Sequence, residues 1–356
     1  MSKLKAAVIG VGGISECHIK GYRQLKDDVE VYAFCDINPD RLKYMGDTFG
    51  IPEERRYLDK DEMLKAHPEI DICSVCTWNS AHAECTIAAL NAGCHVICEK
   101  PMAMNGEEAR AMKEAADRNG KLLMIGFVRR HGRDAKTLID FVKGGFFGDM
   151  YYAKATYVRR NGAPGGWFGD KSRSGGGPVI DLGVHVIDLC KYIMGNHKPV
   201  SVYAATFDKI GDRRHLEESK AWVSTGRAKN DIFDVEDFAT ALIRFDNGAI
   251  ISLETSFSLN TAEPRAEIEI YGDKGGAKLG DEVTMASDLC GHLVDLSFPS
   301  NKNFVFEESF DAEIKNFVDA VLGRAECLAP AADGVSLMDI IDAIYKSAAT
   351  GSEVKI

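Results

Sequence analysis

The stretch LKAAVIGVGGIS, residues 4–15, sets the expectation for the first half of the chain. Its first six residues are an apolar run typical of a buried strand, a glycine-rich turn follows at Gly10, and a helical pattern comes next. This order predicts a dinucleotide-binding fold, because Gly10 permits a tight turn and Gly12 lets the backbone approach a pyrophosphate at the helix N-terminus. Ser15 replaces the third glycine of the motif. Serine is small, so we expect the packing of helix on strand to be loosened rather than lost.

A second strand, VEVYAFC at residues 29–35, ends at Asp36. An acid at this position can hydrogen-bond the adenosine ribose hydroxyls and would repel a 2′-phosphate, so NAD is favoured over NADP. Arg41, one short turn later, could partly reverse this preference. The Asp36 carboxylate could also cap the helix that begins near Pro39, and the two roles are compatible.

The stretch VICEKPMAM, residues 96–104, predicts a polar group at the edge of the sheet. A short buried strand is followed by Lys100 and by Pro101, which cannot continue a sheet. Parallel strands in open α/β sheets end at the crevice where ligands bind, so we expect Lys100 there. The bond before Pro101 could be cis, since that form costs only about 0.5–1 kcal/mol at proline. The alternative is a surface lysine in a turn.

Further strands at 71–76 and 122–126 complete a doubly wound parallel sheet. Thr77 and Asn79 follow the first of these, so we expect them at the same crevice as Lys100. The expected helices lie at about 39–49, 60–66, 81–92 and 105–119. His82 is expected to cap or pack its helix rather than to perform chemistry.

Composition changes after residue 126. An amphipathic helix within 127–148 is followed by long strands that alternate with period two, typical of a mostly antiparallel sheet. One face of such a sheet is left open, and we expect a homo-oligomer to form through this face.

Helices are expected at about 308–323 and 334–349. A charged loop at 210–232 is typical of a lid, a binding segment or an oligomer contact. The sequence thus predicts domains at 1–126 and 127–356.

The segment PVIDLGVHVIDLCKYIMG predicts a helix over about 178–194. Asp181 and His185 lie at i and i+4 on one face, with Asp188 one turn on. Buried polar groups need partners, so a purely structural pair is one interpretation. A metal is disfavoured, because this spacing supplies two ligands and no third or fourth is evident; we therefore expect no metal.

Bulk composition excludes several classes of protein. The chain has 356 residues and a formal net charge of −11 without a basic run, so a nucleic-acid partner is not expected. No apolar stretch has membrane-spanning length, and no signal peptide is expected before the first strand. Ten cysteines without a disulfide-framework spacing predict reduced thiols and a cytoplasmic location.

These residues together resemble the glucose–fructose oxidoreductase / inositol dehydrogenase family (Gfo/Idh/MocA) over nearly the full chain. The motifs that carry the resemblance are Gly10-x-Gly12-Gly13-Ile14, Asp36, Thr77-x-Asn79-x-x-His82, Glu99-Lys100-Pro101 and Gly176-Gly177-x-x-x-Asp181-x-x-x-His185-x-x-Asp188. Departures from the family pattern are Ser15 at the third glycine and Trp78 where proline is common. The resemblance implies a Rossmann domain, an α+β domain with a large open-faced sheet, and C-terminal helices that return toward the first domain.

The resemblance also implies functional residues. The catalytic group falls on Lys100, Asp181 and His185. Cofactor contacts fall on Gly10, Gly12, Gly13, Ile14, Asp36, Thr77, Asn79, His82, Glu99 and Lys100. For the substrate we expect Lys100, Tyr157, Arg159, Trp167, Asp181 and His185.

The implied reaction is hydride transfer between NAD and a ring secondary alcohol of a sugar, glycoside or inositol. The segment around Trp167 looks most like members that oxidise pyranoses or glycosides, often at the 3-hydroxyl. His185 is the first candidate for the base, since its ordinary pKa is about 6.5, and Lys100 is the alternative. Two other readings stay open: an NAD-dependent glycosidase that returns the hydride, and a non-catalytic NAD-sensing module.

Overall fold

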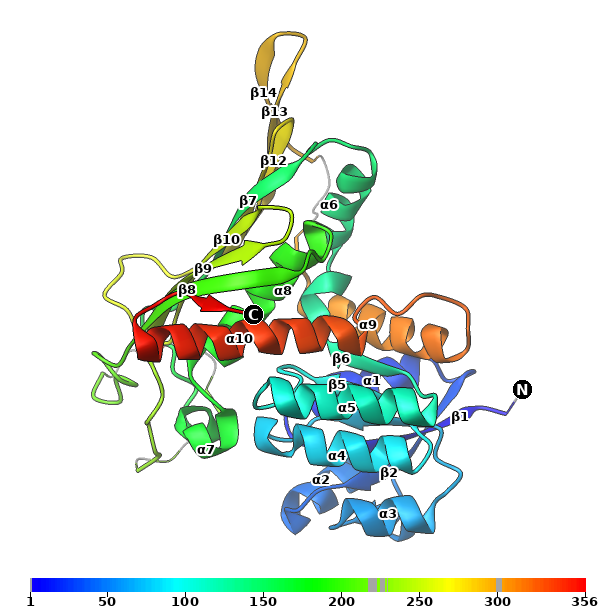
Figure 1. Cartoon of the computed structure of the whole chain (residues 1–356). Helices are drawn as coiled ribbons and strands as arrows, with labels where there is room; N and C mark the ends of the chain where they lie inside the picture. Colours follow the sequence, from blue (N-terminus) through cyan, green and yellow to red (C-terminus); the bar gives the residue numbers. More distant parts are fainter. Residues whose placement is uncertain (1, 217–222, 225–227, 229, 299–302) are drawn as a thin grey trace. The chain divides into compact units, whose positions relative to one another are not determined.

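The computed structural model describes residues 2–216, 223–224, 228, 230–298 and 303–356, which belong to two compact units (Figure 1). The first unit comprises Met1–His131 and Phe306–Val335, and the second comprises Gly132–Val305 and Ser336–Ile356. A segment from near the C-terminus is therefore part of the first unit. The division into domains after residue 126 stays a prediction.

The first unit contains a six-stranded parallel sheet in the order β3-β2-β1-β4-β5-β6. Its strands are β1 (Leu4–Ile9), β2 (Val29–Cys35), β3 (Arg56–Tyr57), β4 (Ile72–Val75), β5 (His95–Glu99) and β6 (Leu123–Gly126). Strand order reverses between β1 and β4, and in such sheets the ligand crevice opens at this reversal. The predicted Rossmann sheet is confirmed.

Helices flank this sheet (Figure 1). They are α1 (Ser15–Gln24), α2 (Pro39–Phe49), α3 (Lys60–Ala66), α4 (Asn79–Asn91), α5 (Gly106–Asn119) and α9 (Phe306–Val321), with short 3₁₀ turns at Glu53–Arg55 and Val128–His131. α4 packs beside α5, and α9 packs on α1 although about 300 residues separate them in sequence. The last long helix, α10 (Ala331–Thr350), begins in the first unit and ends in the second.

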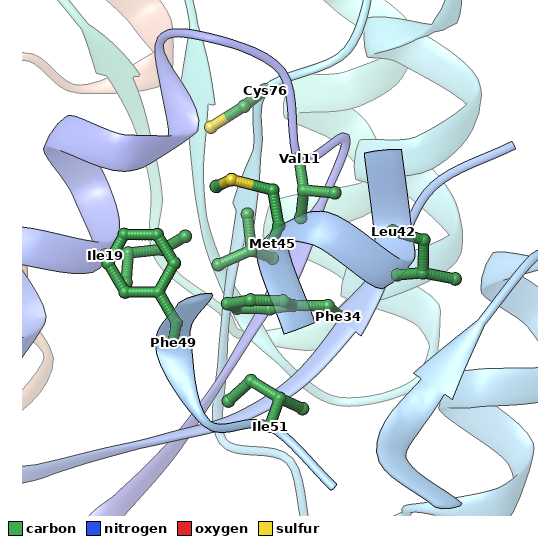
Figure 2. Packing of buried hydrophobic residues seen from close by; sticks show 9 residues of the cluster. Val11, Ile19, Phe34, Leu42, Met45, Phe49, Ile51 and Cys76 are labelled. Atoms are coloured by element: carbon green, nitrogen blue, oxygen red, sulfur yellow. The ribbon is translucent and has the colours of Figure 1, made fainter. Parts of the chain in front are cut away.

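A hydrophobic cluster underlies the glycine turn (Figure 2). Its members are Val8, Val11, Ile19, Phe34, Leu42, Met45, Phe49, Ile51 and Cys76. Phe34 is fully buried and meets Phe49 edge-on, with ring centroids 6.4 Å apart. Burial of one such side chain contributes about 1.5–3 kcal/mol, so this cluster anchors the end of β1 against α1 and α2.

The second unit contains a nine-stranded sheet in the order β14-β13-β12-β11-β7-β10-β9-β8-β15. The strands are β7 (Met150–Val158), β8 (Pro199–Phe207), β9 (Phe238–Phe245), β10 (Ile250–Ser256), β11 (Arg265–Gly272), β12 (Gly275–Leu279), β13 (Val283–Leu289), β14 (His292–Leu296) and β15 (Val354–Lys355). All neighbours are antiparallel except β7 and β10. The predicted mostly antiparallel sheet is confirmed, and the β13–β14 hairpin forms its outer end (Figure 1).

Helices of the second unit are α6 (Arg133–Lys143), α7 (Lys171–Ser174) and α8 (Val184–Ile193), with a 3₁₀ turn at Gly166–Gly169. α8 packs on β7, β10 and β11. The single regular helix expected over 178–194 is wrong in its first part, because Val179–Gly183 is a π-helical turn that leads into α8. Apolar spacing alone could not distinguish the two windings, since all five residues of this turn are buried.

Part of the charged loop at 210–232 lies outside the described residues, namely 217–222, 225–227 and 229. Within the described part of the chain, no helix has the length and apolar character needed to cross a membrane.

Candidate active site

The glycine turn after β1 combines one crowded position with two open ones. Gly10 has φ +84°, and a Cβ on it would lie 2.8 Å from backbone atoms of Cys76 and Thr77. At Gly12 and Gly13 a Cβ would meet nothing within 4 Å. The turn therefore closes tightly against the end of β4 and leaves space above its second and third glycines. Such space is what a pyrophosphate needs, so the turn fits NAD.

Asp36 braces this turn from the end of β2. Its Oδ2 accepts the Val11 amide at 2.8 Å, and its Oδ1 accepts the Asn38 amide at 2.8 Å. The cap of α2 is Asn38, whose side chain accepts two amide hydrogens of the first turn. Capping of that helix by Asp36 is thus wrong. A half-buried carboxylate beside the glycine turn fits recognition of a ribose.

Arg41 is tied to the same turn. Its Nε donates to the Val11 carbonyl at 2.7 Å, and its Nη2 donates to the Gly12 carbonyl and to Glu16, both at 3.2 Å. The Ser15 hydroxyl also donates to the Gly12 carbonyl, at 2.7 Å, and this serine is fully buried. Since the Arg41 guanidinium is already hydrogen-bonded to backbone carbonyls of the turn, the geometry favours NAD over a 2′-phosphorylated cofactor.

Lys100 follows β5, and the Lys100–Pro101 bond is cis. The lysine is half-buried, and its backbone N–H donates to Glu99 Oε2 at 3.1 Å. The His82 ring lies between two turns, with Nδ1 2.7 Å from the Pro101 carbonyl and Nε2 3.2 Å from the Thr77 carbonyl. Burial lowers the pKa of His82, which favours the neutral ring. Because both neighbours are carbonyl oxygens, the neutral ring of His82 donates to one of them, in the turn after β4 or in the turn after β5.

Four further predicted cofactor residues lie at strand ends or in the turns that follow strands of the first unit. Thr77 is half-buried and Asn79 is the buried first residue of α4. Ile14, half-buried, directly precedes α1. Glu99 is 6 % exposed and bonds to protein groups. Direct contact of these residues with a cofactor stays a prediction.

In the second unit, Asp181 lies in the π-helical turn and His185 lies in the first turn of α8. Asp181 and Asp188 are buried, whereas His185 is half-buried. A buried polar group in an apolar helix costs free energy unless it is hydrogen-bonded, so Asp181 and Asp188 need polar partners in the folded chain.

Glu236 supports the start of this helix. Its carboxylate accepts the amides of Gly177 at 3.0 Å and Val179 at 3.1 Å, and the Tyr345 hydroxyl at 2.9 Å. Burial raises the pKa of Glu236. Glu236 was not predicted as a site residue, because it lies far from Asp181 in sequence.

Three of the predicted substrate residues, Tyr157, Arg159 and Trp167, lie in β7 and in the segment that follows it. The Arg159 guanidinium lies 5.2 Å from the centroid of the Tyr157 ring and donates to the Gly162 carbonyl at 3.0 Å. Trp167 stacks on Phe168 with ring centroids 4.0 Å apart. Stacked aromatic faces and a guanidinium are groups that bind sugar rings, but their contact with substrate stays a prediction.

Comparison with known proteins gives the family. Residues 4–127 match the oxidoreductase family with an NAD-binding Rossmann fold, and residues 135–278 match the GFO/IDH/MocA C-terminal domain. The chain belongs to this family.

Relatives match along the whole chain. D-glucoside 3-dehydrogenase of Escherichia coli (strain K12) is 34% identical over 357 residues, covering 100% of this chain and 98% of that protein. Levoglucosan dehydrogenase of Pseudarthrobacter phenanthrenivorans is 29% identical over 391 residues, covering 100% and 99%. A crystal structure of levoglucosan dehydrogenase in complex with NADH is similar with a TM-score of 0.86 at 25% identity, covering 100% and 99%. The predicted family, fold class and NAD cofactor are confirmed, and the chain is an NAD-dependent oxidoreductase acting on CH–OH groups.

Proposed function

We propose that this enzyme oxidises the 3-hydroxyl of a glucoside or related pyranose and passes the hydride to NAD. The observation that carries the proposal is the full-length 34% identity to a D-glucoside 3-dehydrogenase. Other relatives are named for levoglucosan and myo-inositol, which are also ring polyols. The proposed product is a 3-keto sugar.

We assign the chemistry to Lys100, Asp181 and His185. Bound NAD supplies the hydride acceptor. The hydroxyl proton must leave together with the hydride, so a base must reach that oxygen. His185 is the preferred base, Asp181 orients it or holds a neighbouring hydroxyl, and Lys100 stabilises the developing negative charge on oxygen.

The base is tested by the pH–rate profile of His185→Ala. If His185 is the base, the variant loses most of its rate together with the acidic limb of the profile. A variant that keeps both the limb and the rate assigns the base to Lys100 instead.

The substrate class is tested by NADH formation with NAD or NADP against glucosides, levoglucosan and myo-inositol. We expect net NADH with glucosides and a preference for NAD. Aglycone released without net NADH would contradict the proposal and indicate a glycosidase cycle. NAD binding without turnover on any compound would indicate a sensing module.

We further propose that the enzyme is a homo-oligomer formed through the open sheet face. On this face Tyr203 and Leu242 are cross-strand neighbours that are 54% and 50% exposed, and Phe207 stacks on Phe238 beside them. Apolar side chains gathered in this way are typical of an interface. A cytoplasmic location stays a prediction.

A further inference from the structure

Three acidic or basic side chains meet in the interior of the first unit. They are His18 of α1, Glu99 at the end of β5 and Glu313 of α9, which are 0%, 6% and 0% exposed. One ligand-type atom from each lies within 4.8 Å of the other two. Charged groups this deeply buried are costly, so their arrangement needs an explanation.

A chain of hydrogen bonds leads from α1 to the backbone of Lys100. The Tyr22 hydroxyl is 2.8 Å from Ser74 Oγ, which is 3.0 Å from His18 Nδ1. His18 Nε2 is 2.9 Å from Glu99 Oε1. The other oxygen of Glu99 accepts the Lys100 N–H at 3.1 Å. One carboxylate oxygen of Glu99 is thus hydrogen-bonded to His18, and the other is hydrogen-bonded to the backbone of Lys100.

Two glycines make room for this arrangement. Gly126 pairs with Glu99 across the sheet, and a Cβ there would lie 3.3 Å from Glu99 Oε1. Gly21 of α1 faces α9, and a Cβ there would lie 2.9 Å from side-chain atoms of Ile314. Since Ile314 adjoins Glu313, the close approach of the two helices also brings Glu313 to the cluster.

Glu313 differs from the other two members. Among the described residues, neither of its carboxyl oxygens has a hydrogen-bond partner. Burial and the charge of Glu99 raise the pKa of Glu313 well above its ordinary value. This direction favours the protonated form of Glu313, which lowers the repulsion between two carboxyl groups that share a buried site.

We propose that His18 is a positioning residue that fixes Lys100 through Glu99. His18 holds one oxygen of Glu99, so the other stays aimed at the Lys100 N–H. The inference rests on the proposed function, in which Lys100 stabilises charge on the substrate oxygen.

The test compares matched variants. Gln can keep a donor at the position of His18 Nε2, whereas Leu cannot. We expect His18→Gln to retain kcat within about threefold and His18→Leu to lose about tenfold or more. The dissociation constant of NAD should change less than kcat in both variants. Equal losses in His18→Gln and His18→Leu would overturn the inference.

A second readout does not depend on turnover. Reductive methylation with isotopically labelled formaldehyde places an NMR probe on Lys100, identified by its absence in Lys100→Arg. The resonance and its titration should shift in folded His18→Leu and stay in place in His18→Gln. An unmoved Lys100 signal in an active enzyme overturns the positioning role and leaves the proposed function intact. A wild type inactive on every sugar overturns the proposed function, and the NMR comparison still decides the positioning.

The rival interpretation is a metal site. It predicts a metal ion in the purified protein, or stabilisation of the wild type by Zn²⁺ or Mn²⁺ that is lost in Glu313→Gln. Either result would overturn the inference, because His18 would then hold a metal ion instead of donating to Glu99. His18→Gln, which keeps a donor at this position, also serves if His18→Leu does not fold.

Discussion

At the scale of single residues, alanine substitutions at Gly10 and Gly12 should have different effects, the first on stability and the second on NAD affinity. Gly10→Ala places a Cβ against the backbone after β4 at φ +84°, so we expect a loss of about 1–3 kcal/mol in the free energy of unfolding. Gly12→Ala meets no protein atom within 4 Å, so its stability should be nearly unchanged while its affinity for NAD falls. Urea unfolding and NAD titration of both variants check this. Similar stability losses in the two would contradict it.

Glu313 gives a pH dependence of known sign. Because its folded pKa is raised above the ordinary value of 4.5, the folded protein holds a proton there at pH values where the unfolded chain has lost it. Stability then falls as pH rises through this window, by at most about 1.4 kcal/mol per pH unit. Glu313→Gln removes the titration.

The measurement is urea unfolding of wild type and Glu313→Gln at a series of pH values. We expect the free energy of unfolding of the variant, relative to that of the wild type, to increase as pH rises above about 4.5. Parallel stability curves over the whole range would show that Glu313 does not hold the proton.

At the scale of elements, the π-helical turn Val179–Gly183 depends on a distant side chain. Glu236 accepts three hydrogen bonds, and Gln cannot accept all three with its single oxygen. We expect Glu236→Gln to cost about 1–3 kcal/mol of stability and to lower kcat, since Asp181 lies in the turn. Tyr345→Phe removes one bond and should have the smaller effect. Circular dichroism melting and steady-state kinetics measure both, and a larger effect of Tyr345→Phe would contradict this account.

The sequence predicted elements wherever local pattern decides them. The helices Pro39–Phe49 and Lys60–Ala66 have the bounds that their patterns predict. The short strands β12–β14 were not predicted, because their period-two pattern is weak. The π-helical turn was missed because i, i+4 spacing does not fix the winding.

The site was predictable only in part. Gly10 and Lys100 could be predicted because each directly follows a strand, and the apolar pattern of the sequence shows where these strands end. His18 and Glu313 come together only through the packing of α1 on α9, which no local pattern encodes. One signal was available: Glu313 lies between Phe310 and Phe317 on the apolar face of its helix, where an acid is unexpected.

At the scale of the whole molecule, the open sheet face predicts an assembly. Leu242→Lys places a charge among apolar side chains of this face, so we expect it to lower the oligomeric state. Leu58→Lys, at a leucine that is 53% exposed in the first unit, is the matched control and should leave assembly unchanged. Sedimentation velocity reports both. A monomeric wild type at micromolar concentration would refute the proposal.

Deoxy substrates distinguish oxidation at the 3-hydroxyl from oxidation at another carbon. NADH formation would be measured with methyl glucoside and with its 2-deoxy and 3-deoxy analogues under identical conditions. We expect turnover of the parent and of the 2-deoxy compound, a 3-keto product, and no NADH from the 3-deoxy compound. NADH from the 3-deoxy compound at a rate similar to the parent would contradict oxidation at the 3-hydroxyl.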